Sequence, residues 1–442
     1  MRIGSGAGFS GDRLDAATAL LERGELDFLA LECLAERTIA LAQLRRRNDP
    51  SAGYDPRLSR RIAPLLPSLR RRGVRLLSNL GAANPLGAGE AIVAIARKLD
   101  VPVKVAVVTG DDVLDRIDAQ SPSLEGGMPL QSYGRLVSAN AYLGADALMP
   151  ALASGADVIV TGRVADPSLF VAPIAHRYDI ALDDWTRLAG ATAVGHLLEC
   201  AGQLCGGYFA DPGRKDVPGM ADLGFPFADV EPNCAALLGK PAGTGGAITV
   251  ASATEQLLYE VTDPHGYVTP DVVADFSSIA LEQRGPDRVA MQGAQGSPRP
   301  AQLKVSVGYL AGFVGEGEIG YAGSNALARA RLAAEILRHR LASFSEMRVD
   351  LIGSTSLHGR AFDADERPYE VRLRVAARAS SSDTARLVGE EVEALYTNGP
   401  AGGGGVRTSV NEQIGIVSTL IARSSVHARV AVLDWAGHAE AV

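Results

Sequence analysis

The chain has 442 residues, of which 47% are hydrophobic and 21% are charged, and its formal net charge is −8. This composition excludes a disordered chain, and the lack of a basic surplus argues against nucleic acid as a partner. No apolar run reaches the ~18 residues of a membrane helix, and residues 1–6 lack the apolar segment of a signal peptide. The four cysteines form no CxxC motif. We therefore expect a reduced, cytoplasmic protein without a membrane partner.

The first half of the chain alternates short apolar strands with helices. Strands are predicted at residues 26–31, 74–79, 103–108 and 158–161, and helices at residues 15–22 and 89–99. Apolar strands separated by helices are typical of a parallel sheet that is covered on both faces. We predict an α/β fold with a mostly parallel, doubly wound sheet, in which ligands bind at the carboxyl ends of the strands.

The second half of the chain has a different character. Residues 200–320 are rich in Gly and Pro, which indicates long loops and short strands. The remaining predicted elements are helices at 329–341 and 383–396 and strands at 347–352, 369–377 and 425–433. This order indicates a C-terminal α+β domain of the ferredoxin-like kind. We therefore divide the chain into a core domain of residues 1–342 and a C-terminal domain of residues 343–442.

A glycine-rich loop at residues 6–11 has the spacing G-x-G-x-x-G, and Glu32 ends the next predicted strand. A nicotinamide cofactor is one hypothesis, with Glu32 on its ribose. The preceding strand is predicted to have at most three residues, and Asp12 would repel a pyrophosphate, so both features disfavour that cofactor. The alternatives are another anionic ligand, bound with Gly8, Asp12 and Arg13, or a structural turn.

Polar side chains also follow other predicted elements. Asn79 and Asn84 lie in a loop after the second strand and suit ligand contacts, or Asn84 caps the next helix. Asn140 opens a helix predicted to end near residues 154–157. Arg163 ends a buried strand and suits a substrate carboxylate or phosphate. Asp166 follows three residues later and suits acid–base chemistry, although a mutual ion pair is the alternative for both residues.

Two predicted helices carry pairs of polar residues on one face. His196 and Glu199 are three residues apart and suit a general acid and base or, with Asp166, a divalent metal; a buried structural histidine is the alternative. Glu255 and Tyr259 are candidate substrate contacts or parts of a surface helix. The glycine-rich residues 397–405 suit an anion nest or a linker.

Seven motifs run collinearly over nearly the whole chain. They are GAGFSGDR (6–13), the loop 79–85, SANAYLGA (138–145), GADVIVTGRVADPSLF (155–170), GHLLECAGQLCGGY (195–208), GTGGAITVASATEQLLYEVTDPHGYVTPDVVADF (243–276) and NGPAGGGG (398–405). Together they resemble the acyclic terpene utilization protein A family, formerly a domain of unknown function. The resemblance implies a place in the breakdown of citronellol and geraniol through branched acyl-CoA thioesters. Loop 79–85 departs from the family pattern, because Ala82 stands where a second glycine is usual, which leaves the substrate open.

We therefore predict an enzyme that acts by proton transfer on a branched acyl-CoA or a small carboxylic acid, of the hydratase, dehydratase or lyase type. Glu199 or Asp166 serves as the base and His196 as the acid, while Arg163 binds the substrate oxygen and Asn79 and the glycine loops stabilise an oxyanion. The candidate catalytic residues are Asp166, His196 and Glu199. The candidate substrate-binding residues are Gly8, Asp12, Arg13, Asn79, Asn84, Asn140, Arg163, Glu255 and Tyr259.

No cofactor is predicted, although a divalent metal is an option and NAD(P) a weaker one. The expected partners are a small-molecule substrate, such as a CoA thioester, and further copies of the chain in a homo-oligomer. The alternative functions are a nicotinamide-dependent oxidoreductase and a non-catalytic subunit or scaffold of a pathway complex.

Overall fold

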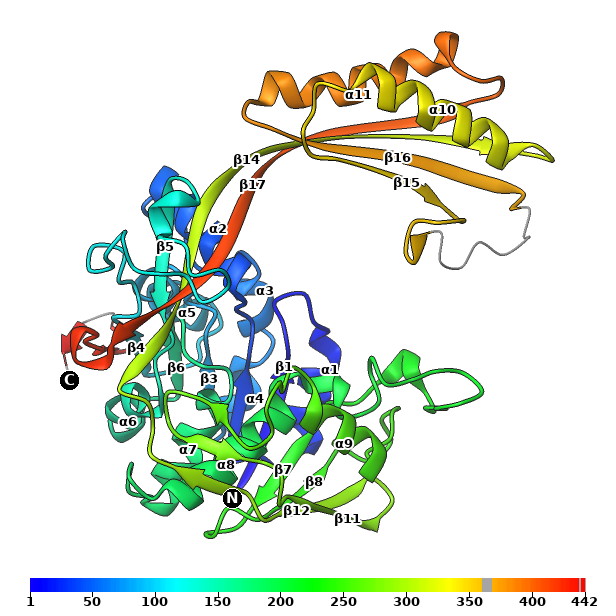
Figure 1. The fold of residues 1–442 in the computed structure, drawn as a ribbon. Coiled ribbons are helices and arrows are strands. Elements are labelled where there is room, and N and C mark those ends of the chain that lie inside the picture. The colour runs from blue at the N-terminus through cyan, green and yellow to red at the C-terminus, as the bar shows by residue number, and fades with distance from the viewer. Residues whose placement is uncertain (360–367, 437–438, 442) are drawn as a thin grey trace. The chain divides into compact units, whose positions relative to one another are not determined.

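The computed structural model describes residues 1–359, 368–436 and 439–441 (Figure 1). It is a mixed α/β protein with two compact units. The larger unit comprises residues 1–132, 136–308 and 416–442, and the smaller unit comprises residues 133–135 and 309–415. This division differs from the predicted boundary at 342/343. The strands β14 (Gln302–Ala322) and β17 (Gly404–Ala422) each begin in one unit and end in the other, so the tail of the chain returns to the larger unit.

The sheet of the larger unit has eleven strands in the order β11-β12-β8-β7-β1-β2-β3-β6-β4-β18-β19. Its centre is parallel and consists of β1 (Arg2–Ala7), β2 (Phe28–Leu31), β3 (Arg75–Ser78), β6 (Val158–Thr161) and β4 (Val105–Thr109).

The flanking strands of this sheet are antiparallel. On one side they are β7 (Phe227–Val230), β8 (Ala236–Gly239), β12 (Arg288–Gln292) and β11 (Ala280–Gly285), and on the other β18 (Arg429–Leu433) and β19 (Ala439–Ala441). The prediction of a mostly parallel sheet is therefore correct only for the centre, where helices connect successive strands. The flanking strands come from the Gly- and Pro-rich middle and from the tail, and short connections join the antiparallel pairs β7–β8, β11–β12 and β18–β19.

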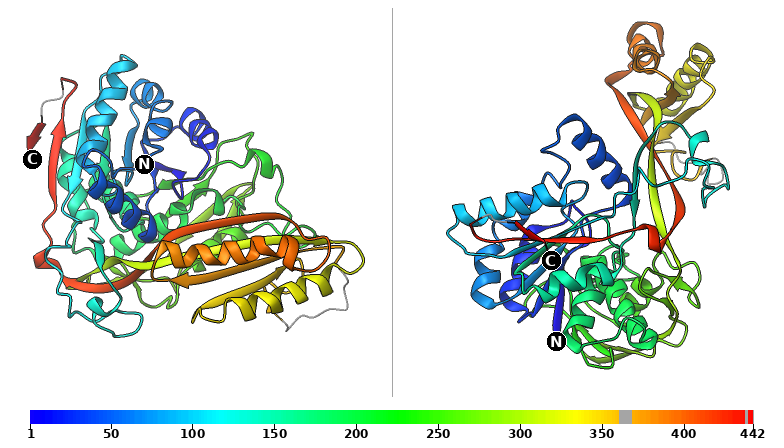
Figure 2. Two further views of the ribbon diagram at one scale, coloured as in Figure 1. Left: turned by 90° about the horizontal axis from the view of Figure 1, so that it is seen from above. Right: turned by 90° about the vertical axis from the view of Figure 1, so that its left-hand side faces the viewer.

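Successive residues of the central strands point to opposite faces of the sheet. Leu29 and Leu31 pack in one buried cluster, whereas Phe28 and Ala30 pack in another. The first cluster lies against α1 (Leu14–Arg23), α3 (Leu58–Ile62), α4 (Leu66–Arg72) and α5 (Pro85–Lys98), and the second against α6 (Ala145–Ala153), α7 (Ser168–Tyr178) and α8 (Trp185–Glu199). Helices thus cover both faces of the sheet (Figure 2). The doubly wound description itself stays a prediction.

Other elements of the larger unit lie at the rims of this sheet. They are α2 (Glu36–Asn48), β5 (Leu136–Ala141), α9 (Val250–Leu258) and a small sheet of β13 (Gln295–Ser297), β10 (Val273–Asp275) and β9 (Tyr267–Val268). The prediction that Asn140 opens a helix is wrong. Residues 136–141 form a strand because they pair with β14. No described helix is long and apolar enough to cross a bilayer.

The smaller unit contains the second part of β14, then α10 (Ala326–Arg340), β15 (Met347–Ile352), β16 (Glu370–Ala379), α11 (Ser382–Asn398) and the first part of β17. Its strands follow the order β15-β16-β14-β17, and β16 is antiparallel to both of its neighbours. Apolar residues of both helices and of the sheet form a separate core. The ferredoxin-like assignment stays a prediction, while the β-α-β-β-α-β element order is observed.

Candidate functional site

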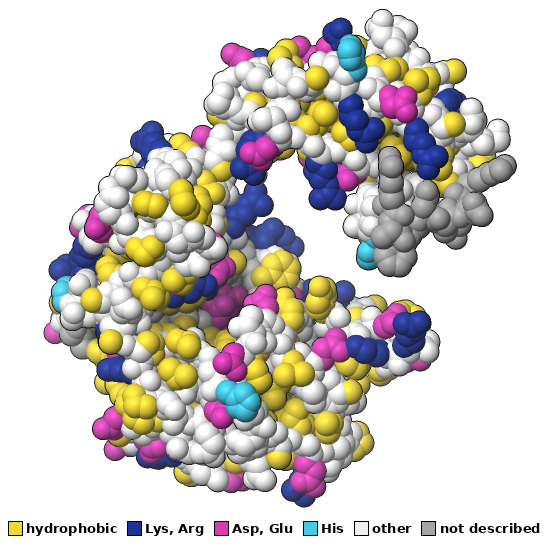
Figure 3. All heavy atoms as spheres, in the orientation of Figure 1, with side chains coloured by type: hydrophobic (Ala, Val, Ile, Leu, Met, Phe, Trp, Pro, Cys, Tyr) yellow, Lys and Arg dark blue, Asp and Glu magenta, His cyan; other side chains and the backbone are white. Residues whose placement is uncertain are grey.

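A cavity of about 840 Å³ in the larger unit opens at the carboxyl ends of the parallel strands. Gly8 follows β1, Glu32 follows β2, and Asp166 lies in the loop after β6; all three residues line the cavity. The acidic residues of its lining are Asp12, Glu32, Glu36, Asp166, Glu199 and Glu260. In the space-filling view of Figure 3, acidic side chains (magenta) gather in a hollow of the surface. The strand-end rule therefore located this cavity correctly.

Asp166 is the residue shared by this cavity and a second one of about 390 Å³. Its carboxylate lies 3.0 Å from Nη1 of Arg163 in an ion pair, and 35% of its side chain is exposed. Burial raises the pKa of Asp166 to about 7, because the attraction of Arg163 only partly offsets the burial and the charge of Glu199 adds to it. Asp166 thus gains and loses a proton near neutral pH, as a general acid or base requires.

Arg163, the partner of Asp166 in this ion pair, is buried, with only 2% of its side chain exposed. Its guanidinium stacks on the ring of Tyr142 at 4.1 Å, donates to the carbonyl of Leu34, and lies 4.0 Å from Glu36. Burial alone would raise the pKa of Glu36, but Arg163 and a hydrogen bond from the Tyr142 hydroxyl lower it to about 2. Arg163 is therefore engaged by protein groups, and the mutual ion pair with Asp166 is what the structure shows.

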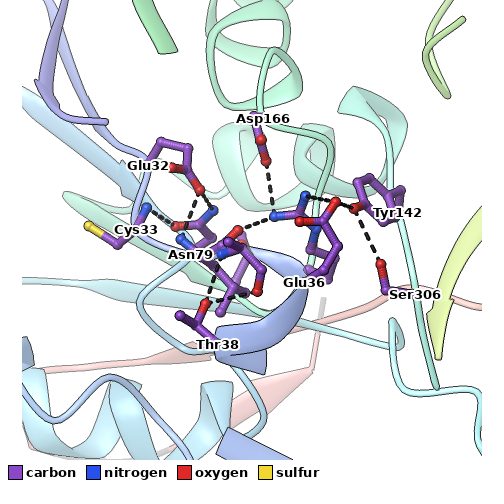
Figure 4. A network of polar contacts seen from close by, with 12 residues as sticks. Glu32, Cys33, Glu36, Thr38, Asn79, Tyr142, Asp166 and Ser306 are labelled. Carbon is purple, nitrogen blue, oxygen red and sulfur yellow. Dashed lines mark hydrogen bonds and ion pairs between the residues drawn. The ribbon is translucent and has the colours of Figure 1, made fainter. Parts of the chain in front are cut away.

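Asn79 lies beside Glu32, to which it is joined by a hydrogen bond (Figure 4). Its Nδ2 donates to Glu32 at 2.9 Å, and its Oδ1 accepts from the backbone N–H of Cys33 at 2.7 Å. The N–H of Leu34 also donates to Glu32 at 2.8 Å, yet burial raises the pKa of Glu32 well above its usual range. One N–H of the Asn79 amide and its Oδ1 are thus paired within the protein, and the oxyanion role stays a prediction for the second N–H.

His196 and Glu199 form a close pair at the end of α8. Nδ1 of His196 lies 2.8 Å from Oε1 of Glu199, and Nε2 lies 3.2 Å from the carbonyl of Leu257. A carbonyl only accepts, so Nε2 carries a hydrogen, and the short Nδ1–Oε1 contact holds one more proton on either the histidine or the carboxyl. Burial raises the pKa of Glu199, and its Oε2 has no hydrogen-bond partner in the described structure.

The two members of this pair differ in their access to the cavity. The described lining of the cavity includes Glu199 but not His196, which is 1% exposed and packs against the rings of Tyr267 and Phe276. The side chain that faces the cavity is therefore Glu199, and His196 orients it from behind.

The glycine-rich loop is shaped by contacts within the chain. The strand β1 has six residues rather than the expected three, and Gly6 lies inside it. A Cβ on Gly8 would lie 2.6 Å from the carbonyl carbon of Cys200, so this glycine permits the loop to pack against the end of α8. Asp12 accepts a hydrogen bond from the N–H of Gly8 at 2.9 Å. The carboxylate thus occupies a donor that a dinucleotide phosphate would need.

The remaining predicted residues divide between the cavity and other places. Arg13 and Tyr259 line the cavity. Asn84 caps α5, where its Oδ1 accepts from the N–H of Gly87 at 3.1 Å. Asn140 donates to buried Asp111 at 2.9 Å, and Glu255 pairs with Lys215 outside the main cavity. Residues 397–405 belong to the smaller unit.

Comparison with known protein families identifies the family that the seven sequence motifs resemble. The sequence model of the acyclic terpene utilisation family, AtuA, matches residues 1–432. The chain belongs to this family. No curated protein and no solved structure matches the chain. Membership indicates a role in acyclic terpene utilisation and leaves the reaction itself to be argued from the site.

In this AtuA family member, sequence reasoning missed Glu36 and Glu260 as cavity residues. Glu260 directly follows Tyr259, so its position beside a candidate contact was the only available signal. Glu36 begins α2 and shows no distinguishing pattern. Among the described residues no group of three His, Cys, Asp or Glu side chains that could hold a metal ion is found, and the metal alternative for His196, Glu199 and Asp166 stays a prediction.

Proposed function

We propose that the protein is an enzyme that moves a proton to or from carbon on a branched acyl-CoA or a small carboxylic acid, of the hydratase, dehydratase or lyase type. The observation that carries the proposal is the presence in one cavity of two carboxyls, Asp166 and Glu199, whose pKa values are raised by burial. Asp166 has a pKa of about 7, and Glu199 shares a proton with His196. Carboxyls with such raised pKa values serve as acid–base groups at physiological pH.

The second cavity supports a substrate with an apolar part. Its walls are largely apolar, including Ala165, Pro270, Leu303 and Leu420, and Asp166 lies at its border with the acidic cavity. A hydrocarbon chain placed there would bring its polar end to Asp166. The volume of about 390 Å³ is within the range of small-molecule sites.

In the hydration direction, Glu199 in its ionised form takes a proton from water as the water oxygen bonds to one alkene carbon. The protonated carboxyl of Asp166 gives its proton to the other carbon. The π bond of the alkene, one O–H bond of water and the carboxyl O–H bond of Asp166 break, while one C–O bond, one C–H bond and the O–H bond of the Glu199 carboxyl form. Dehydration is the reverse. Arg163 stabilises the carboxylate that Asp166 becomes, and His196 acts as a positioning residue for Glu199.

Proton exchange between substrate carbon and solvent tests this proposal, and it does not require the natural substrate. The protein is incubated in D₂O with saturated and α,β-unsaturated branched acyl-CoAs and with the free acids, and mass spectrometry follows deuterium and water uptake. We expect uptake in at least one substrate class, with Asp166→Asn and Glu199→Gln each slower by about 10²–10⁴-fold. Glu255→Gln, outside the main cavity, is the matched control. Absence of uptake from every compound, or unchanged rates in both variants, would contradict the proposal.

The role of His196 needs a separate readout. If His196 only positions Glu199, His196→Asn should shift the pH at which the exchange rate is half-maximal as well as lower the rate. A lower rate with an unchanged pH profile would instead indicate a purely structural effect.

A further inference from the structure

A third cavity, of about 480 Å³, adjoins the mouth of the acidic cavity. Its lining includes four arginines: Arg13, Arg57, Arg60 and Arg61. Arg13 and Arg57 line both cavities, so the two spaces are continuous. Among the described residues, none of these four arginines forms an ion pair with a carboxylate. Arginines elsewhere in the chain, such as Arg2, Arg72, Arg163 and Arg374, do form such pairs. This cavity thus gathers four guanidinium groups without an ion pair in a chain whose net charge is −8.

Arg61 is the buried member of this cluster. Only 2% of it is exposed, and its Nη2 donates to the carbonyls of Ser10 at 2.7 Å and Asp12 at 2.9 Å, with a longer contact to Phe9 at 3.4 Å. Its Nε is buried without a hydrogen-bond partner in the described structure. A buried guanidinium with only carbonyl partners is costly unless an anion approaches it.

The first turn of α1 contributes further donors to the same cavity. The helix has ten residues, and its N-cap, Arg13, makes no side-chain cap hydrogen bond. The first backbone N–H groups of a helix without such a cap remain free to bind an anion. Two carboxylates, Asp12 and Asp15, also line the cavity. Asp12 is engaged by the N–H groups of Gly8 and Arg13, and the arginines outnumber the carboxylates.

We propose that this arginine cavity binds a phosphate or diphosphate group. Guanidinium groups pair with phosphate oxygens through two parallel hydrogen bonds, and several unpaired arginines around one space suit more than one phosphate charge. Because the space opens into the acidic cavity, the phosphate group belongs to the carrier part of a substrate whose reacting end lies at Asp166. This last step rests on the proposed function, whereas the anion site rests on the arginines alone.

Direct binding tests the site independently of turnover. Isothermal titration calorimetry measures the affinity of the full-length protein for inorganic diphosphate, ADP, coenzyme A and phosphate-free pantetheine. The variant Arg57→Gln/Arg60→Gln removes two cavity charges while leaving buried Arg61 in place. Arg45→Gln/Arg47→Gln removes two exposed charges from α2 and is the matched control. Circular dichroism establishes that each variant is folded.

We expect the wild-type protein and the α2 control to bind at least one phosphate probe, the cavity variant to bind it at least tenfold more weakly, and added salt to weaken binding. Coenzyme A binding at least tenfold tighter than diphosphate would identify a coenzyme carrier, and equal affinities would identify a simpler phosphate ester. Absence of binding by all three phosphate probes at millimolar concentration, or equal affinity in the cavity variant, overturns the site. If the phosphate probes bind but no substrate takes up deuterium from solvent, only the proposed reaction is contradicted. If pantetheine thioesters take up deuterium but no phosphate probe binds, only the anion site is contradicted.

Discussion

Replacement of Asp166 by asparagine removes a carboxyl whose pKa is about 7 in the folded protein and about 3.9 in an unfolded chain. Between those two pH values the folded protein holds a proton that the unfolded chain has lost. The stabilisation is therefore complete below about pH 4 and is lost as the pH rises through 7. The wild-type free energy of unfolding should fall over this window, and the Asp166→Asn variant should lack that part of the fall.

The size of the effect follows from the shift in pKa. Three pKa units correspond to about 4 kcal/mol. Because 35% of the Asp166 side chain is exposed, solvent screening reduces the expected change to about 2 kcal/mol. Among the other buried carboxyls whose pKa values are raised, Asp111 and Asp271, both at about 6, act in the same direction. They are present in both proteins, so they cancel in the comparison.

Urea denaturation followed by circular dichroism at pH 5, 6, 7 and 8 measures this difference. A change in packing at the substituted side chain shifts the variant equally at each pH, so the slope of stability against pH is the informative quantity. Asp49→Asn is the control, since hydrogen bonds from Ser51 lower the pKa of that exposed carboxyl; it is ionised in both states between pH 5 and 8, so its replacement should leave the slope unchanged. Parallel wild-type and Asp166→Asn curves between pH 5 and 8 would refute the assignment of a protonated Asp166 at neutral pH, and with it the basis of the proposed function.

Three further predictions concern stability and are measured by urea denaturation. Gly8→Ala should lose about 1–3 kcal/mol, because the new Cβ lies 2.6 Å from the backbone of Cys200; wild-type stability would show that the loop is free to move. Asn84→Ala should lose about 1 kcal/mol because the cap of α5 on Gly87 is removed, and Asn84→Asp should restore it. Phe170→Ala, at a fully buried position, should lose about 3–5 kcal/mol, and a loss below 1 kcal/mol would contradict its place in the core.

Several features of the site were predictable from short stretches of sequence. The apolar runs at residues 28–31, 75–78 and 158–161 form central strands because each is buried on both faces. Their order placed polar residues at one edge of a sheet, and the cavity lies there. The three-residue spacing of His196 and Glu199 likewise indicated their contact, since a helix brings such residues to one face.

Only the tertiary structure decided which of these groups meet one another. Burial of Arg163 between Tyr142, Glu36 and Asp166 joins segments that are distant in the sequence, and its cause is the packing of α2 and β5. The return of residues 416–442 to the larger unit also depends on pairing between β18 and β4, more than three hundred residues apart. Local sequence determines periodicity and caps, whereas burial, and with it the pKa of Asp166, depends on which distant segments exclude water from a side chain.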